Sequence, residues 1–398
     1  MKKVFTLLIS FSLFHFLFAQ HSDNSDSIRN EEDCNLRLSL LTCTPGTELY
    51  STFGHSAIRV TDISSGTDII FNYGTFDFDD PAFLPKFVRG KLLYFVSIDE
   101  FKNFLDQYNY EKRGITEQVL DLSCAVKKKL LVALHDNAKV ENRYYKYDFV
   151  YDNCTTRIRD IIFSAANDRV ETKNIRPKDD ITFRNLIHEY LDKGHHYWSK
   201  LGIDILLGSP LDIKLSNSEA MFLPDYLLKA FDSTTLNGNS LVREKNTILK
   251  STMPDNKAPS FTPFWFFTIL FLIIAILSFV PGILRIKKET RFFSFFDFIL
   301  FLLSGAFGFL LLFMWFGTDH QACRNNFNLV WAFPAHLIIV FYLFKKRSWL
   351  RYYFFANAIL LLLLLMGWKW LPQEMNNGLL PIAGLLMIRS FILSKKNE

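Results

Sequence analysis

The sequence predicts an α+β soluble domain followed by an α-helical membrane domain of about five spans. Two observations lead to this prediction. Short segments with strand-like alternation and segments with helical spacing follow one another between residues 35 and 166, whereas long apolar runs dominate the chain after residue 262. With 398 residues, the chain is long enough for two or three domains, each with its own core.

The first nineteen residues have the pattern of a secretory signal peptide: a basic start, a short apolar core and a small residue, Ala19, before the expected cleavage point. An uncleaved membrane anchor is the alternative, but the apolar stretch is short for a span. Either interpretation places the domain formed by residues 20–261 outside the cytoplasm.

The soluble domain is predicted to mix strands and helices. Residues 35–46 alternate like a strand, and residues 55–62 and 68–78 form a predicted antiparallel hairpin around the turn-rich segment 63–67. The same patterns predict further strands over 91–98 and 115–123 and helices over 98–113, 124–141 and 151–166.

Cys154 is predicted to lie in the first turn of the last of these helices, because "YDN" before it supplies capping residues. Unpaired N–H groups and the positive end of the helix dipole favour a thiolate there, and the same groups can receive an oxyanion. His55 opens the predicted hairpin, where an imidazole gains nothing by packing. A nearby imidazole would lower the pKa of the thiol and return a proton to a leaving group. The two residues form a candidate catalytic pair, and ordinary packing and surface roles are the alternative.

A third residue usually orients the imidazole of such a pair at its other ring nitrogen. If the hairpin turns near residues 63–66, the residues that face His55 fall near 72–74. Asn72 in "FNYGTF" is the best polar candidate, and Asp77 is the alternative.

Five apolar segments follow residue 262, and each approaches the ~20 residues that cross the hydrocarbon core. Lys and Arg concentrate in alternate connections ("RIKKETR", "KKRSWLR" and "SKKNE"), which are therefore expected in the cytoplasm. The connections 317–328 and 372–378 then lie outside, as does the soluble domain, and the protein is predicted to be a multi-pass membrane protein. The predicted spans are 262–284, 292–316, 329–344, 352–371 and 379–394, within a membrane domain 262–398.

Four motifs resemble the Lnb family of lipoprotein N-acyltransferases of Bacteroides-type bacteria. They are "TCTPGTELYSTFGHSAIRV", "FNYGTFDF", "YKYDFVYDNCTTRIRD" and "DHQACRNNFNLVWAFP". The order of the His and Cys motifs also resembles the circularly permuted papain-like fold of NlpC-type hydrolases and the lecithin:retinol acyltransferase group. The resemblance implies a permuted papain-like domain in the periplasm, with Cys154 as nucleophile and His55 as base. It also implies that the membrane domain lies in the cell inner membrane as a multi-pass domain.

The activity that the resemblance implies is N-acylation of exported lipoproteins. The thiolate would attack a phospholipid ester, and the α-amine of a diacylated lipoprotein would then take the acyl chain from the thioester. No metal or organic cofactor is expected. Two alternatives stay open: a membrane-tethered cysteine hydrolase of cell-wall peptide or lipid esters, and a non-catalytic scaffold that handles lipoproteins or lipids.

A loop between two spans normally needs only polarity. The connection 317–328 carries His, Arg and Asn side chains beyond that need, so it is a candidate substrate-binding surface. We hypothesise that it forms a polar floor beneath Cys154, with a guanidinium that contacts a lipid phosphate through two oxygens. An ordinary interfacial belt of solvated side chains is the alternative. The floor residues would be His320, Arg324, Asn326 and Asn328.

Other features predict less. The net charge of +5 is explained by juxtamembrane loops and a mixed surface, so no nucleic-acid partner is expected. The "GHHYW" cluster at 194–198 has no further ligands at a zinc-like spacing, so no metal site is predicted. Cys34 and Cys43 are candidates for a disulfide by their nearness in sequence, although sequence alone cannot establish the pairing.

Overall fold

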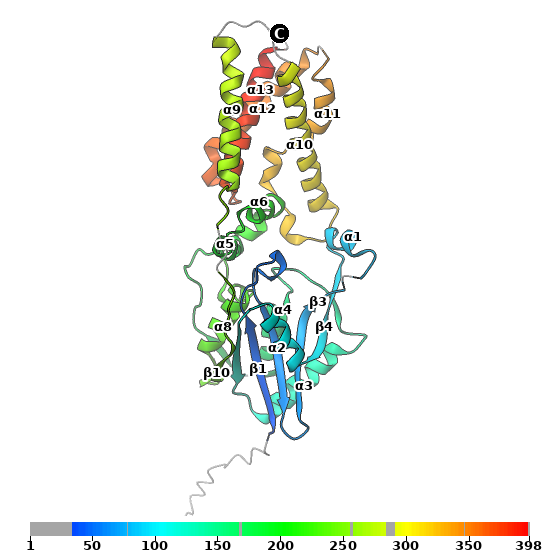
Figure 1. The fold of residues 1–398 in the computed structure, drawn as a ribbon, viewed down its shortest axis with the longest axis vertical. Coiled ribbons are helices and arrows are strands. Elements are labelled where there is room, and N and C mark those ends of the chain that lie inside the picture. Colours follow the sequence, from blue (N-terminus) through cyan, green and yellow to red (C-terminus); the bar gives the residue numbers. More distant parts are fainter. Residues whose placement is uncertain are drawn as a thin grey trace, which may run out of the picture. The chain divides into compact units, whose positions relative to one another are not determined.

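The computed structural model describes residues 34–77, 79–166, 169–254, 258–283, 291–345 and 347–396. The predicted signal peptide, residues 1–19, lies outside the described residues. The described chain consists of a soluble part with strands and helices, followed by a helical part (Figure 1).

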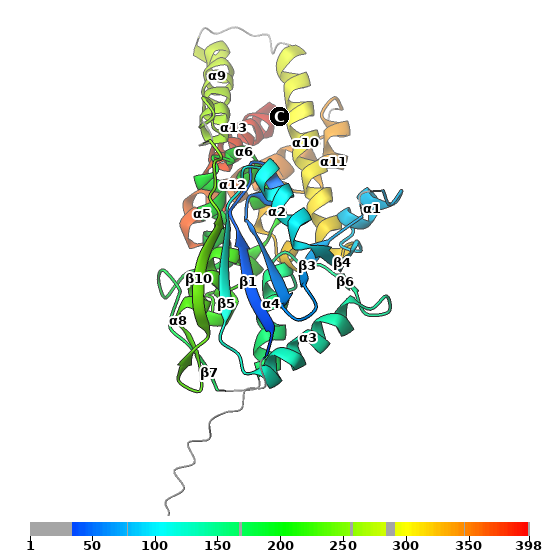
Figure 2. The ribbon, with the colours of Figure 1, turned by 60° about the horizontal axis from the view of Figure 1, so that its bottom comes forward.

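The soluble part is built on a seven-stranded sheet with the order β10-β5-β1-β2-β3-β4-β6 (Figure 2). All neighbouring strands pair antiparallel. The hairpin predicted around residues 63–67 is confirmed, with Asp62 opposite Thr67. The strands are β1 (Leu36–Cys43), β2 (His55–Asp62), β3 (Thr67–Thr75), β4 (Leu93–Glu100), β5 (Ile115–Leu120), β6 (Tyr144–Lys146) and β10 (Val242–Leu249).

Helices cover both faces of this sheet, because alternate strand residues point to opposite sides. Leu40 and Ile58 pack with α3 (Cys124–Ala138), α4 (Cys154–Ala166) and α8 (Pro224–Ser233). On the other face, Leu41, Cys43 and Ala57 pack against Phe104 and Tyr108 of α2 (Phe101–Tyr110). The three predicted helices are confirmed, with slightly shorter bounds.

The rest of the soluble part consists of short elements. They are η1 (Leu49–Ser51), α1 (Phe83–Val88), α5 (Phe183–Lys193), α6 (Tyr197–Leu206), η2 (Ser209–Asp212), α7 (Asn217–Ala220) and the small sheet of β7 (Val170–Thr172), β8 (Thr234–Leu236) and β9 (Asn239–Ser240). Of these, α1, α5, α6 and η2 contact the loops between the membrane helices.

The helical part contains α9 (Pro263–Ile283), α10 (Arg291–Phe316), α12 (Trp349–Gly367) and α13 (Leu380–Lys396). By length and composition, three helical segments of the described chain can cross a membrane: Phe292–Phe316, Trp349–Trp370 and Asn377–Lys395. Pro263–Ser278 is a shorter apolar helix. The long apolar helices agree with the predicted spans 292–316, 352–371 and 379–394.

The predicted span over 329–344 does not form one continuous helix. This segment forms short pieces: η4 (Phe327–Val330), α11 (His336–Ile339) and η5 (Val340–Tyr342). Pro334 lacks an N–H group and interrupts any regular helix there. The segment instead packs closely on α10, since a Cβ on Gly308 would overlap Ala332 O and one on Gly305 would overlap Leu337 N.

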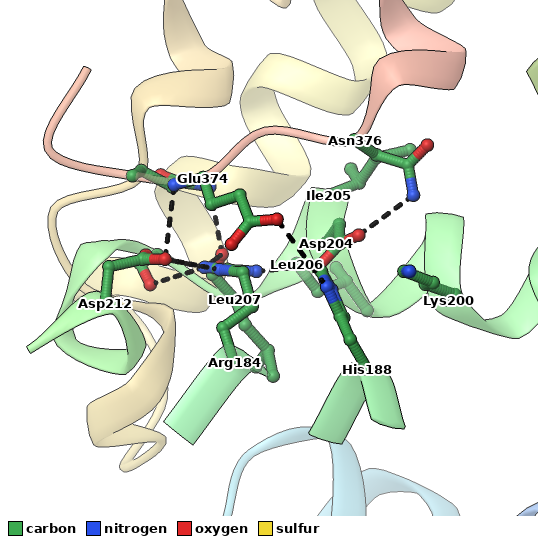
Figure 3. A network of polar contacts seen from close by, with 12 residues as sticks. Arg184, His188, Lys200, Asp204, Ile205, Leu206, Leu207, Asp212, Glu374 and Asn376 are labelled. Carbon is green, nitrogen blue, oxygen red and sulfur yellow. Dashed lines mark hydrogen bonds and ion pairs between the residues drawn. The ribbon is translucent and has the colours of Figure 1, made fainter. Parts of the chain in front are cut away.

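A buried polar network attaches the soluble part to the membrane loops (Figure 3). The fully buried guanidinium of Arg184, on α5, donates to Asp204 of α6 and to Asp212 of η2, each at 2.8 Å. Asp204 also receives hydrogen bonds from His188 at 2.8 Å and from Asn376 at 2.9 Å. A buried charge without its partner costs several kcal/mol, so these groups hold their elements together.

The C-terminal end of α6 is satisfied by side chains from the membrane loops. The last carbonyls of a helix have no partner within the helix. Asn328 Nδ2 donates to Asp204 O at 2.8 Å, Asn326 Nδ2 donates to Ile205 O at 2.8 Å, and Gln373 Nε2 donates to Leu207 O at 3.1 Å. Two separate loops of the helical part therefore bind the same helix end.

We expect Asp204→Ala to destabilise the protein strongly, by about 3–5 kcal/mol, because it leaves Arg184 buried with one of its two carboxylate partners removed. Thermal unfolding and limited proteolysis of the detergent-solubilised protein measure the effect. Asp192→Ala is the matched control, since Asp192 pairs with Lys200 in a more exposed ion pair and its loss should cost less than about 1 kcal/mol. Equal stability of the two variants would contradict the role given to the network.

The charge pattern of the loops predicts the orientation of the membrane part. Reporter fusions after residues 288 and 348 should report the cytoplasm, and a fusion after residue 322 should report the outside. A cytoplasmic signal at residue 322 would overturn this orientation.

Candidate functional site

Cys154 is the first residue of α4, as predicted. The cap is Asn153, whose Oδ1 accepts from the N–H groups of Thr155 at 2.8 Å and Thr156 at 2.9 Å. Asn153 Nδ2 in turn donates to Phe222 O at 2.9 Å and so anchors the helix start. The cap fixes the thiol at the positive end of the helix dipole.

His55 begins β2, where it lies opposite Cys43 of β1. The preceding residue has to be glycine for two reasons. Gly54 has φ of +79°, and a Cβ on it would lie 2.7 Å from Cys43 O. In the "GH" pair of the sequence, Gly54 therefore meets a requirement of the backbone, and His55 supplies the functional side chain.

Asn72 of β3 lies next to the imidazole, with Oδ1 2.5 Å from His55 Nε2. Because an amide oxygen only accepts, Nε2 carries the proton in this contact and Nδ1 is left for the thiol. A bulge between Asn72 and Thr75 breaks the register with β4 and includes Gly74 at φ +88°. Asp77, the alternative candidate, accepts from the N–H of Asp79 in a local turn.

The surroundings of Cys154 favour an ion pair with His55. Burial raises the pKa of the thiol, but the charge and hydrogen bond of His55, the backbone N–H of Ser56 and the Thr155 hydroxyl lower it, with a net value of about 7. Burial lowers the pKa of His55, yet the Cys154 charge and the hydrogen bonds to Cys154 and Asn72 raise it overall. Each member therefore stabilises the charged form of the other.

The other described cysteines differ sharply. Burial raises the pKa of Cys43 and of Cys323 to about 12 each, so both are neutral at physiological pH. Cys34 and Cys124 are disulfide-bonded. The predicted Cys34–Cys43 bridge is wrong, because Cys43 is free and packs beneath α2.

The structure places three of the four predicted floor residues, His320, Asn326 and Asn328, at attachment points. His320 Nε2 donates to Phe87 O of α1 at 3.1 Å, and Asn326 and Asn328 are buried against the end of α6. Among the described residues, none of the four is hydrogen-bonded to Cys154 or His55. The amides of Asn326 and Asn328 are used by main-chain carbonyls, which speaks against a substrate-facing role for them, whereas Arg324 is exposed.

Aromatic neighbours of the thiol were not predicted. A Cβ on Gly74 would lie 3.7 Å from Cys154 Cβ and 3.8 Å from Tyr147 Cε2, so the tyrosine ring borders the site. Burial raises the pKa of the Tyr145 phenol, and the charge of the nearby Cys154 raises it further. The tyrosine-rich run "YYKYDFVYDNC" was the available sequence signal. In the described chain, no three His, Cys, Asp or Glu side chains gather as a metal site.

The fold and the site together define a membrane protein that carries a thiol–imidazole pair on an extramembrane α+β domain. Two family models match the chain: the Lnb N-terminal periplasmic domain over residues 31–189 and the Lnb transmembrane domain over residues 255–397. The chain therefore belongs to the Lnb family, with a periplasmic N-terminal domain and a transmembrane domain in the inner membrane. No curated protein and no solved structure matches it.

The thiol pKa can be measured by the pH dependence of alkylation with iodoacetamide. We expect a midpoint near pH 7, with fast reaction above it because the thiolate then predominates. His55→Ala should move the midpoint up toward the ordinary value of 9.0, and Cys154→Ala should abolish the fast reaction. A wild-type midpoint near 9, or no shift in His55→Ala, would contradict the ion pair.

Proposed function

We propose that this protein is a lipoprotein N-acyltransferase that works through a thioester on Cys154. The observation that carries the proposal is the side-chain arrangement at the start of α4: a thiol of lowered pKa, an imidazole beside it and an amide behind the imidazole. The order of His before Cys and the antiparallel sheet also support a permuted papain-like domain.

The first half-reaction transfers an acyl group from a phospholipid to the enzyme. The Cys154 thiolate attacks the ester carbonyl, and the oxyanion accepts a hydrogen bond from the main-chain N–H of Cys154, because those of Thr155 and Thr156 already donate to Asn153 Oδ1. The C–O bond then breaks, and the imidazolium of His55 protonates the departing oxygen. The products are an acyl thioester and a lysophospholipid.

The second half-reaction transfers the chain to the acceptor. The neutral α-amine of the lipid-modified N-terminal cysteine of a lipoprotein attacks the thioester carbonyl, and His55 takes the proton that the amine loses. The C–S bond breaks, which restores the thiolate and releases the N-acylated lipoprotein. Asn72 keeps the same ring nitrogen facing the sulfur through both steps.

A membrane domain suits this reaction because donor and acceptor are both anchored in the bilayer. A thioester formed at the membrane surface lies near the second substrate and away from bulk water. Arg324, exposed on the loop after α10, is our proposed contact for the phosphate of a phospholipid. The mechanism requires no metal ion and no organic cofactor.

The test supplies purified protein in proteoliposomes with a synthetic diacylated lipopeptide and follows both products by mass spectrometry. With both substrates present, we expect N-acyl lipopeptide and lysophospholipid. When the acceptor is omitted, we expect an acyl adduct on Cys154. Cys154→Ala should abolish all three, whereas Cys323→Ala, which alters a buried neutral thiol, should retain activity.

Other outcomes would favour the alternatives. Release of free fatty acid with no N-acyl product, in the presence of acceptor, would identify a hydrolase. Absence of both the adduct and the products would identify a scaffold. Normal activity of Cys154→Ala would overturn the proposed mechanism.

A further inference from the structure

Helix α1 exposes an apolar surface that no other element of the described chain covers. None of its six residues is buried, and Leu84, Phe87 and Val88 are 65%, 48% and 36% exposed. Adjacent large apolar side chains on a protein surface mark a contact with a partner or a membrane.

The backbone of α1 is attached to the end of a membrane helix. Asp319 N donates to Arg89 O at 3.0 Å, and His320 Nε2 donates to Phe87 O at 3.1 Å. These residues follow Phe316, the last residue of α10, by three and four positions. Three residues span at most about 10 Å, and the headgroup layer of a bilayer is about 5–8 Å thick on each side. Helix α1 is therefore within reach of the lipid headgroups.

The charges around α1 suit a lipid surface. Lys86, Arg89 and Lys91 are exposed on and after the helix. Two of the nearby carboxylates are already paired, Asp80 with Lys86 at 2.6 Å and Asp319 with Lys146 at 2.9 Å, and Asp77 and Asp79 lie on the connection before α1. Apolar side chains beside basic ones are typical of a short segment that lies in the membrane interface and faces phosphates.

A row of aromatic rings leads from α1 to the thiol. Phe83 of α1 lies 5.8 Å from Phe76, Phe76 lies 5.1 Å from Tyr94, and Tyr94 stacks on Tyr147 at 4.3 Å between ring centroids. A Cβ on Gly74 would lie 3.7 Å from Cys154 Cβ and 3.8 Å from Tyr147 Cε2, so Tyr147 ends the row beside the thiol. In the fold, α1 connects β3 to β4 (Figure 2), so the helix and the catalytic end of these strands are neighbours.

We propose that α1 and this aromatic row form the binding path for the acyl chain of the phospholipid donor, from the outer leaflet to Cys154. The proposal rests on the proposed acyl transfer and adds the route of the substrate. The apolar residues of α1 enter the leaflet, Arg89 and Lys91 bind lipid phosphates, and the flat rings offer an apolar wall along which a hydrocarbon chain lies.

The first test compares two acyl donors. Leu84→Asn with Phe87→Asn should lower the rate of thioester formation from phospholipid at least ten-fold, and leave the rate from a short, water-soluble acyl thioester within two-fold of wild type. The matched control is Ile63→Asn, which changes an exposed apolar residue in the distant β2–β3 turn and should alter neither rate. Loss with both donors, or loss with neither, would overturn the proposed path.

The second test does not depend on activity. In a Cys154→Ala background, an environment-sensitive fluorophore attached through Leu84→Cys should be quenched by nitroxide-labelled phospholipids in proteoliposomes, and the same fluorophore at Ile63→Cys should not. Absence of quenching at position 84 would overturn the membrane contact. If wild type formed no thioester from either donor while position 84 was quenched, the acyl transfer would be wrong and the membrane contact would stand.

A photo-crosslink tests the route itself. Phospholipid with a diazirine near the end of one acyl chain should label peptides that contain Phe76, Phe83 or Tyr94, as identified by mass spectrometry. Labelling confined to the helices α9–α13 would overturn the aromatic path.

Discussion

The buried guanidinium of Arg184 is the interaction on which the attachment of the soluble part depends. A charge removed from water has to be paired and hydrogen-bonded, and Arg184 meets this demand with Asp204, Asp212 and main-chain carbonyls. Asp204, in turn, receives Asn376 from a loop between membrane helices. The pairing of one cation thus fixes α5, α6 and η2, and it presents the end of α6 to the membrane loops.

The proposed nucleophile is distinguished from the other free cysteines by its neighbours and not by its burial. Cys43, Cys154 and Cys323 are all buried, and burial raises the pKa of each thiol. Only Cys154 has an imidazole, a backbone N–H and a helix start within reach, and these outweigh the desolvation. A site that is poor in water and holds a thiolate is what a thioester intermediate needs, because water would otherwise hydrolyse it.

The sequence predicted local features well and long-range contacts poorly. The alternation of β2 and β3 around a short turn was enough to bring Asn72 to His55, and the polar run before Cys154 was enough to start a helix there. The segment 329–344 has the composition of a spanning helix, but hydropathy does not register Pro334, which interrupts a regular helix, or the close packing of the segment on Gly305 and Gly308 of α10. Asn326 and Asn328 were predicted to face a substrate because their partners, the carbonyls of α6, lie more than a hundred residues away in sequence and could not be foreseen.

The loop after α10 makes two attachments of different kinds, and their combination bears on catalysis. At one end, Asp319 and His320 hold the backbone of α1, and at the other, Asn326 and Asn328 hold α6. One attachment alone would leave the soluble part free to pivot about it. Two attachments on one short loop remove that freedom, so α1, which we propose as the entry for the acyl chain, keeps a constant position relative to the membrane helix. The entropy cost of fixing the position of α1 is then met when the protein folds, and it does not weaken substrate binding. This favours the reactive geometry at Cys154.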